Sequence, residues 1–246
     1  MRVILAFLTF AVLAGCAAPG WHTAARQETL PTADPTPSDS PSQSPSPQPR
    51  TSVAAPPYRS PAPPRDGKGT FNSTASGQSA VFGTAGALKR YCVQVEDGIV
   101  GISADEFAQG VDRVLSDEHS WIAGKKWMFQ RVPDCAGANV RVRLTTPFSV
   151  SRFCQPTQTP ARYSCYMAGS LFINLDRWRY GVAHYPSLAE YRHMVINHEM
   201  GHFLGFQHAY CPGTGKLAPV MQQQSISLKG CVANPYPYPD GVKYLG

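Results

Sequence analysis

Two histidines separated by three residues, His198 and His202, set the strongest constraint on how this chain folds. Residues four positions apart project from the same face of an α-helix, so the two imidazoles lie side by side if the segment is helical. Helix signals surround them: Ser187 and Glu190 form a capping box, and helix-compatible residues continue to Leu204. The sequence therefore predicts a helix from about Ser187 to Leu204 that presents both imidazoles on one face.

A third histidine, His208, follows shortly after this helix. On a continued helix its side chain would lie about 120° away from that of His202, so the chain has to turn after Leu204. Gly205 can adopt the positive φ that such a turn needs. Three neutral imidazoles are a ligand set found in catalytic zinc sites. We therefore expect His198, His202 and His208 to bind one Zn²⁺ ion.

An acidic residue, Glu199, lies about 100° around the helix from His198, where it can act beside a metal without binding it. The string H-E-M-G-H-F-L-G-F-Q-H, from His198 to His208, resembles the metzincin signature H-E-x-x-H-x-x-G-x-x-H at every fixed position. The resemblance implies a zinc metallopeptidase with Glu199 as general base. It also implies a metzincin-like fold in which Met221 forms the Met-turn beneath the metal, and in which the strand Leu171–Leu175 forms the upper rim of the cleft.

Residues around this signature look like a family of actinobacterial exported proteins known only as a domain of unknown function. The segments that carry this likeness are His208–Gly213 and Gly230–Pro235. One position departs from some metzincins, which have a metal-linked tyrosine two residues after the Met-turn methionine; here the residue is Gln223. Three later tyrosines are left as candidates to stabilise an oxyanion, although packing is the favoured role for each: Tyr236, Tyr238 and Tyr244.

Earlier segments predict one sheet and a further helix. Ser103 and Glu106 form a capping box before an amphipathic helix from about Ala104 to Leu115. Alternating apolar and polar residues, or short apolar runs, predict four strands: Arg90–Val95, Trp127–Val132, Asn139–Leu144 and Ser170–Leu175. This order favours an α+β fold, a mixed α/β sandwich with one twisted sheet.

The N-terminal end has the pattern of an export signal: Arg2, an apolar run, and then Leu-Ala-Gly before Cys16, which resembles the bacterial lipobox. The run is shorter than the ~20 residues that a membrane-spanning helix needs. We expect residues 1–16 to be a lipoprotein signal and a lipid on Cys16 to anchor the protein at the outer face of the cytoplasmic membrane or in the cell envelope. An ordinary signal peptide is the alternative. Residues 17–69, rich in Pro and Ser, predict a disordered linker before a zinc peptidase domain at 70–246.

Six cysteines follow Cys16, and an even number in an exported chain favours disulfides. Pairing near neighbours is the preferred arrangement, although the sequence permits others: Cys154 with Cys165, Cys211 with Cys231, and Cys92 with Cys135. Zinc binding by cysteines is disfavoured because no C-x-x-C spacing occurs. Zinc binding stays an alternative only for Cys211, which follows His208 by three residues.

Charge and the remaining histidines identify no further partner. The net charge is +6 and the isoelectric point about 9.0, but the basic residues are scattered, so we expect no nucleic acid to bind. A mild attraction to anionic envelope polymers stays open. The histidines outside the motif lack metal-ligand spacing: His22, His119, His184 and His193.

These features predict a monomeric, membrane-anchored, extracellular zinc-dependent endopeptidase acting on a peptide or protein substrate. Zinc would activate a water molecule, and Glu199 would accept its proton. Two alternatives remain: a non-catalytic zinc-containing envelope binding protein, and a cell-wall peptide amidase. Glu199 argues against the first because a structural zinc site needs no base, and no residue demands the second.

Overall fold

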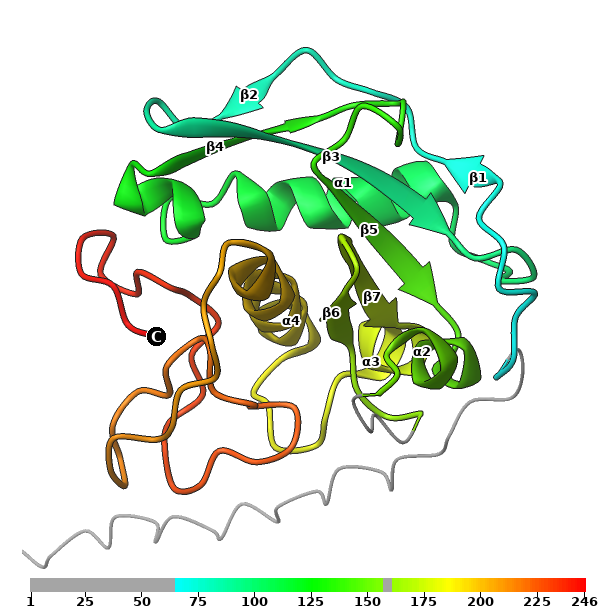
Figure 1. Ribbon diagram of the computed structural model, residues 1–246. Coiled ribbons are helices and arrows are strands. Elements are labelled where there is room, and N and C mark those ends of the chain that lie inside the picture. Colours follow the sequence, from blue (N-terminus) through cyan, green and yellow to red (C-terminus); the bar gives the residue numbers. More distant parts are fainter. Residues whose placement is uncertain (1–64, 157–160) are drawn as a thin grey trace, which may run out of the picture. The chain divides into compact units, whose positions relative to one another are not determined.

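A single mixed sheet organises the computed structural model, which describes residues 65–156 and 161–246 (Figure 1). The strands are β1 (Ser73–Thr74), β2 (Val81–Phe82), β3 (Ala87–Val95), β4 (Trp127–Arg131), β5 (Val140–Thr145), β6 (Cys165–Met167) and β7 (Ser170–Asn174). They are ordered β2-β4-β3-β5-β7-β6, and β1 pairs with the end of β3. Strands β4, β3, β5 and β7 are parallel, whereas β1, β2 and β6 are antiparallel to their neighbours. The expected α+β class with one twisted sheet is confirmed.

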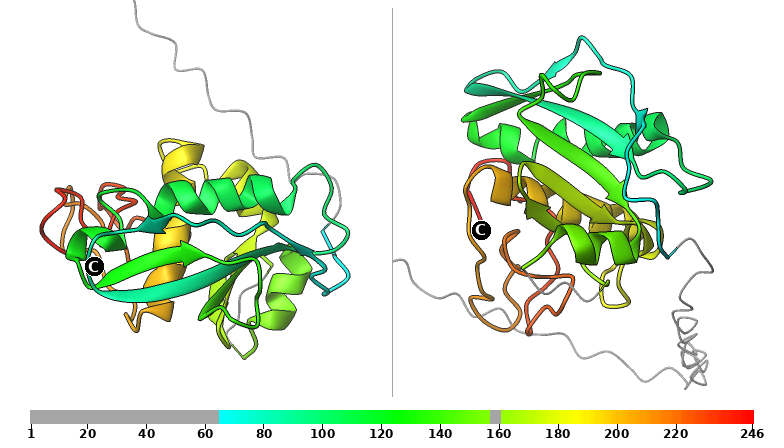
Figure 2. Two further views of the ribbon diagram at one scale, coloured as in Figure 1. Left: turned by 90° about the horizontal axis from the view of Figure 1, so that it is seen from above. Right: turned by 45° about the vertical axis from the view of Figure 1, so that its right-hand side comes forward.

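Helices cover the two faces of this sheet unequally. They are α1 (Ala104–Leu115), the short 3-10 helix η1 (Trp121–Gly124), α2 (Pro147–Phe153), α3 (Leu175–Tyr180) and α4 (Leu188–Phe203). Helices α1 and α2 lie on opposite sides of the sheet (Figure 2). On the α1 side, Phe107 of α1 meets Trp178 of α3 edge to face at 4.8 Å between ring centroids, and α4 packs against α1 and β7. The main core lies on that side.

The longest helices agree with the expectations from the sequence. The Ser103 hydroxyl accepts a hydrogen bond from the Glu106 amide at the start of α1, and the Ser187 hydroxyl accepts one from the Glu190 amide at the start of α4. The four expected strands are present as β3, β4, β5 and β7, with β3 beginning earlier, at Ala87. Capping and periodicity are local properties, which is why they predict these elements well.

The strand β7 corrects two expectations. It ends at Asn174, because the Asn174 side chain accepts hydrogen bonds from the amides of Asp176 and Arg177 and so caps α3. The expectation that Leu171–Leu175 forms the rim of a cleft is wrong, because β7 is paired on both sides, with β5 and with β6. The edge position belongs to β6, a strand too short to predict from its sequence.

Three disulfides join the six cysteines of the described chain in the preferred arrangement: Cys92–Cys135, Cys154–Cys165 and Cys211–Cys231. Cys211 is therefore not available as a thiolate ligand for zinc. Three disulfides fit an oxidising compartment, as expected for an exported protein.

The expected lipid anchor lies outside the described part of the chain. The export signal, Cys16, His22 and most of the expected linker fall in residues 1–64, outside the described part of the chain. Among the residues that the structure describes, no helix has the length and apolar character needed to cross a bilayer.

A buried carboxylate anchors the first described residues to the sheet. Glu96, just after β3, is 1% exposed and accepts hydrogen bonds from the Gly69 amide, from the amide and hydroxyl of Thr146, and from the Ser149 hydroxyl. Residues 65–69, which the sequence assigns to the linker, therefore pack against the domain.

Replacing this carboxylate should destabilise the fold. We expect Glu96→Ala to lower the free energy of unfolding by about 2–4 kcal/mol, because it leaves several buried donors without an acceptor, each costing about 1–3 kcal/mol. Urea denaturation measures the change. Glu118→Ala, at an exposed glutamate, is the control and should change stability by less than about 0.5 kcal/mol. Equal stability of both variants would contradict the anchoring role.

Candidate metal centre

The structure brings the three predicted histidines together at the end of α4. His198 and His202 lie on α4, and His208 follows in the loop after it. One ring nitrogen from each of the three lies within 4.8 Å of the others, and the Nε2 atoms of His202 and His208 are 3.1 Å apart. Zn–N bonds of about 2.0–2.1 Å in tetrahedral geometry suit nitrogens at this spacing.

A tight turn makes this convergence possible. Leu204 ends α4, and Gly205 adopts φ 97°, the left-handed conformation that glycine tolerates. The Phe206 amide donates to the Gly201 carbonyl at 2.9 Å and the Gly205 amide to the His202 carbonyl at 3.1 Å. These two bonds define a Schellman motif, which reverses the chain at a helix end. The predicted role of Gly205 is confirmed.

Backbone carbonyls orient two of the imidazoles. His198 Nδ1 lies 2.9 Å from the Val220 carbonyl oxygen, and His202 Nδ1 lies 2.9 Å from the Phe206 carbonyl oxygen. Because a carbonyl only accepts hydrogen bonds, each Nδ1 donates, and the lone pair of the neutral ring is left on Nε2. This arrangement is the usual support for histidine ligands of a metal. The donor set therefore fits zinc.

Burial favours the uncharged form of the site. It lowers the pKa of His198 to about 3, with His202 and His208 adding to the shift. Burial also lowers the pKa values of His202 and His208. Neutral imidazoles bind metal ions, whereas protonated ones do not. The three rings are thus in the state that coordination requires.

The fourth group of the motif, Glu199, is 4% exposed and lies beside these rings. Burial raises its pKa to about 8, although a hydrogen bond from the Tyr166 backbone amide acts in the opposite direction. Its Oε2 atom is buried and makes no hydrogen bond to any described residue. A buried oxygen without a partner is costly, so its presence indicates a group placed for a ligand or a reaction.

All four motif side chains line one cavity of about 410 Å³. Gln207 and three segments complete its wall, and the sequence did not identify them as site residues: Tyr163–Tyr166 around β6, Met194 and Val195 on α4, and Gln223–Ile226 after Met221. They carry no motif. Their proximity depends on how α4, β6 and the C-terminal loops pack.

The loop after Met221 is held firmly against α4. The Gln224 side chain donates to the carbonyls of Pro219 and Asn234, at 3.1 and 2.7 Å. The hydroxyl groups of Ser225 and Tyr191 are 2.9 Å apart, and Tyr191 lies on α4. This side of the cavity is therefore a preformed wall.

Met221 is fully buried against the helix that carries the motif. At Gly201, between the two helical histidines, an added Cβ would lie 2.3 Å from Met221 Sδ and 2.8 Å from a ring carbon of Trp121. Trp121 also donates from its indole to the Asn197 carbonyl at 3.0 Å. Only glycine allows both side chains to approach α4 this closely.

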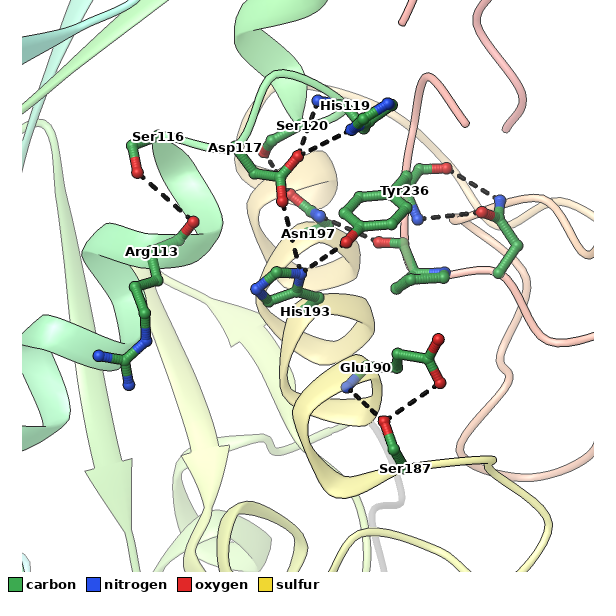
Figure 3. Close-up of polar contacts among 12 residues, drawn as sticks. Arg113, Ser116, Asp117, His119, Ser120, Ser187, Glu190, His193, Asn197 and Tyr236 are labelled. Carbon is green, nitrogen blue, oxygen red and sulfur yellow. Dashed lines mark hydrogen bonds and ion pairs between the residues drawn. The ribbon is translucent and has the colours of Figure 1, made fainter. Parts of the chain in front are cut away.

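The three C-terminal tyrosines do not line the cavity, which corrects their candidacy as oxyanion donors. The Tyr236 hydroxyl lies 3.1 Å from His193 Nδ1, on a face of α4 that also includes Asn197 (Figure 3). Tyr238 and Tyr244 pack together at 5.7 Å between ring centroids. Tyr244 also packs against Trp121 of η1, at 5.9 Å between ring centroids.

The three described histidines outside the motif have structural partners. His119 and His193 lie on either side of Asp117, at 3.1 and 3.8 Å (Figure 3). His184 Nε2 lies 2.7 Å from the Gln224 carbonyl oxygen. Within the described residues none of the three joins a metal-binding group.

Comparison with known proteins gives one match. A family model described as "Protein of unknown function (DUF3152)" matches residues 58–239, a range that includes the whole candidate metal centre. No curated protein and no solved structure matches the chain. The family description assigns no activity.

The close packing at Gly201 can be tested by adding one methyl group. We expect Gly201→Ala to destabilise the protein by about 1–3 kcal/mol, the usual cost of overpacking, and to weaken zinc binding by displacing Met221 and the neighbouring Val220 carbonyl. Urea denaturation and zinc competition with a chelator measure the two effects. The double variant Gly201→Ala/Met221→Ala should be more stable than the sum of the single losses predicts. Strictly additive losses would show that the two residues are not coupled.

Proposed function

The chain belongs to the DUF3152 family of proteins of unknown function, and from its metal centre we propose that it is a metzincin-type, zinc-dependent endopeptidase. One observation carries the proposal: three imidazoles with converging nitrogens lie beside Glu199, a buried carboxylate with a partner-free oxygen, in a single cavity. A site that only stores or binds zinc has no need of that carboxylate.

His198, His202 and His208 would hold the zinc ion. When bound, zinc polarises a substrate carbonyl and makes a water molecule more acidic. Hydrogen bonds from Nδ1 to the Val220 and Phe206 carbonyls keep two rings in the tautomer and orientation that the metal needs. The protein's contribution is thus a rigid, neutral ligand set.

Glu199 would move the proton. Its carboxylate takes a proton from the attacking water and gives it to the amine that leaves when the peptide bond breaks. Burial stabilises the protonated form of this carboxyl group. A low-polarity position therefore suits a group that must hold a proton briefly and then return it.

Strand β6 supports a peptide as the substrate. It is the edge strand of the sheet on the cavity side, and Cys165 and Tyr166 line the cavity. An extended peptide can add to such an edge through main-chain hydrogen bonds. The Tyr166 amide already bonds to Glu199, so this edge and the general base are adjacent.

The charges of the cavity favour cleavage within a chain over recognition of a chain end. Among the residues that line the cavity, Glu199 is the only acid and no lysine or arginine is present. Apart from the zinc ion itself, a terminal carboxylate, or the carboxylates of a cell-wall peptide, would find no cationic partner among the described residues of the cavity. An endopeptidase is therefore preferred to a cell-wall peptide amidase.

The Met221 packing supports the metzincin type. In the implied fold the Met-turn lies beneath the metal, and here Met221 contacts α4 between the two helical histidines, next to the Val220 carbonyl. This contact agrees with the position that the metzincin resemblance implies for the Met-turn methionine.

Zinc binding is the first test. We expect the purified protein to retain one zinc ion per chain after dialysis, measured by elemental analysis. His202→Ala should lose this zinc ion. Its zinc affinity should fall by more than the roughly 10–100-fold that is lost when a hydrogen-bond partner of a ligand is removed. His193→Ala removes a histidine of the same helix outside the cluster and should keep the zinc. A wild-type protein that never holds stoichiometric zinc would reject the proposal.

Hydrolysis is the second test. Glu199→Gln should keep its zinc but cleave a broad peptide library about 10²–10⁴ times more slowly than wild type, because the amide preserves size and cannot accept the proton. Glu190→Gln, an exposed glutamate on the same helix, is the matched control and should remain active. Equal activity of Glu199→Gln and wild type would refute the mechanism. If all three proteins are zinc-loaded and inactive, the non-catalytic binding protein is favoured.

A further inference from the structure

The sheet face remote from α1 and α4 carries two neighbouring arginines. In β5, Val142 and Leu144 are buried in the main core, whereas Arg141 and Arg143 alternate with them and are partly exposed. The two arginines therefore face the other side of the sheet, the side on which α2 lies (Figure 2). Residues two apart on one strand share a face. The two guanidinium groups therefore belong to one surface.

Arg143 is held in a defined orientation. Its guanidinium carbon lies 4.4 Å from the centre of the Phe71 ring and 5.8 Å from that of Phe172, and its Nε donates to Gln94 Oε1 at 3.0 Å. These contacts use the faces of the guanidinium group and one nitrogen. No described residue accepts a hydrogen bond from its terminal nitrogens.

Neither arginine has a carboxylate partner within the described part of the chain. Among the described residues neither Arg141 nor Arg143 forms an ion pair, whereas Arg131 and Arg152 pair with Asp112 and Asp66. Burial lowers the pKa of Arg143, and repulsion from the charge of Arg141 lowers it further. Two adjacent unpaired cations, one half-buried, carry an electrostatic cost that a bound anion would remove.

Arg90 extends the positive surface onto β3. The register pairs Cys92 with Arg141 and Gln94 with Arg143, and Arg90 shares the face of Cys92 and Gln94 because it precedes them by even intervals. Arg90 is exposed, and its side chain makes no ion pair with a described residue. Three cations along two adjacent strands suit a repeating anion better than a single ion.

We propose that Arg141 and Arg143, with Arg90, form a docking surface for a linear polyphosphate chain. The fixed guanidinium group of Arg143 offers the two-pronged donor geometry that matches phosphate oxygens. None of the three arginines lines the cavity of the metal centre, so a bound polymer leaves that cavity accessible. The proposal is independent of the peptidase activity.

Binding to inorganic polyphosphate, followed by fluorescence anisotropy over a range of salt concentrations, tests the surface. Wild-type protein should bind with an affinity that falls as salt rises, because each phosphate contact releases counterions. Arg141→Gln/Arg143→Gln should bind at least about tenfold more weakly, with a salt dependence reduced by about 1.5–2 in logarithmic slope. Arg141→Gln alone, which leaves the packed Arg143 intact, should give about half of that change in slope.

The matched control removes the same charge elsewhere. Lys216→Gln/Lys243→Gln changes two exposed lysines of the C-terminal loops and should bind like wild type. An equal loss in the control would mean that net charge alone attracts the polymer, which overturns the proposal. Binding to vesicles of phosphatidylglycerol in preference to polyphosphate, or equal competition by orthophosphate at the same phosphate concentration, would also overturn it in favour of a lipid surface or a single ion.

Discussion

The close approach of two side chains to α4 at Gly201 is the contact on which the candidate metal centre depends. Met221 and Trp121 occupy the space that any side chain at this position would need. The same approach brings the Val220 carbonyl to His198. Trp121 in turn stacks on Phe206 at 4.8 Å between ring centroids, and the Phe206 carbonyl accepts from His202. One glycine thus allows both supporting carbonyls to reach the histidines.

Burial of the site has a cost that other interactions have to offset. Neutral imidazoles and a carboxyl group with an unpaired oxygen are placed in low-polarity surroundings, where each loses hydration. Around them the C-terminal loops contain little regular structure, yet the Cys211–Cys231 disulfide closes the segment that contains Met221. Side-chain bonds from Gln224 fasten its end. Cross-links and buried amide hydrogen bonds stabilise what secondary structure does not.

The two faces of the sheet have different chemistry because β5 alternates. Val140, Val142 and Leu144 form part of the core under the helices, and the arginines between them face the other way. The candidate metal centre belongs to the helix side and the proposed polyanion surface to the opposite side. A strand one residue out of register would exchange these two roles, so the hydrophobic pattern of β5 fixes both.

Local signals in the sequence determined a large part of this protein: the capping boxes of α1 and α4, the turn at Gly205, the alternation of β5, and the shared face of His198 and His202. Each depends on residues within a few positions of one another, where helix and strand geometry impose the outcome. The tertiary structure alone decided that β6 takes the sheet edge, that the C-terminal tyrosines lie away from the cavity, and that the carbonyls of Val220 and Phe206 orient the imidazoles. Every residue has a backbone carbonyl, and a three-residue strand is too short to show an alternating pattern. Neither feature can therefore be predicted from the sequence. Only the packing of distant segments against α4 selects which carbonyl groups and which strand reach the candidate metal centre.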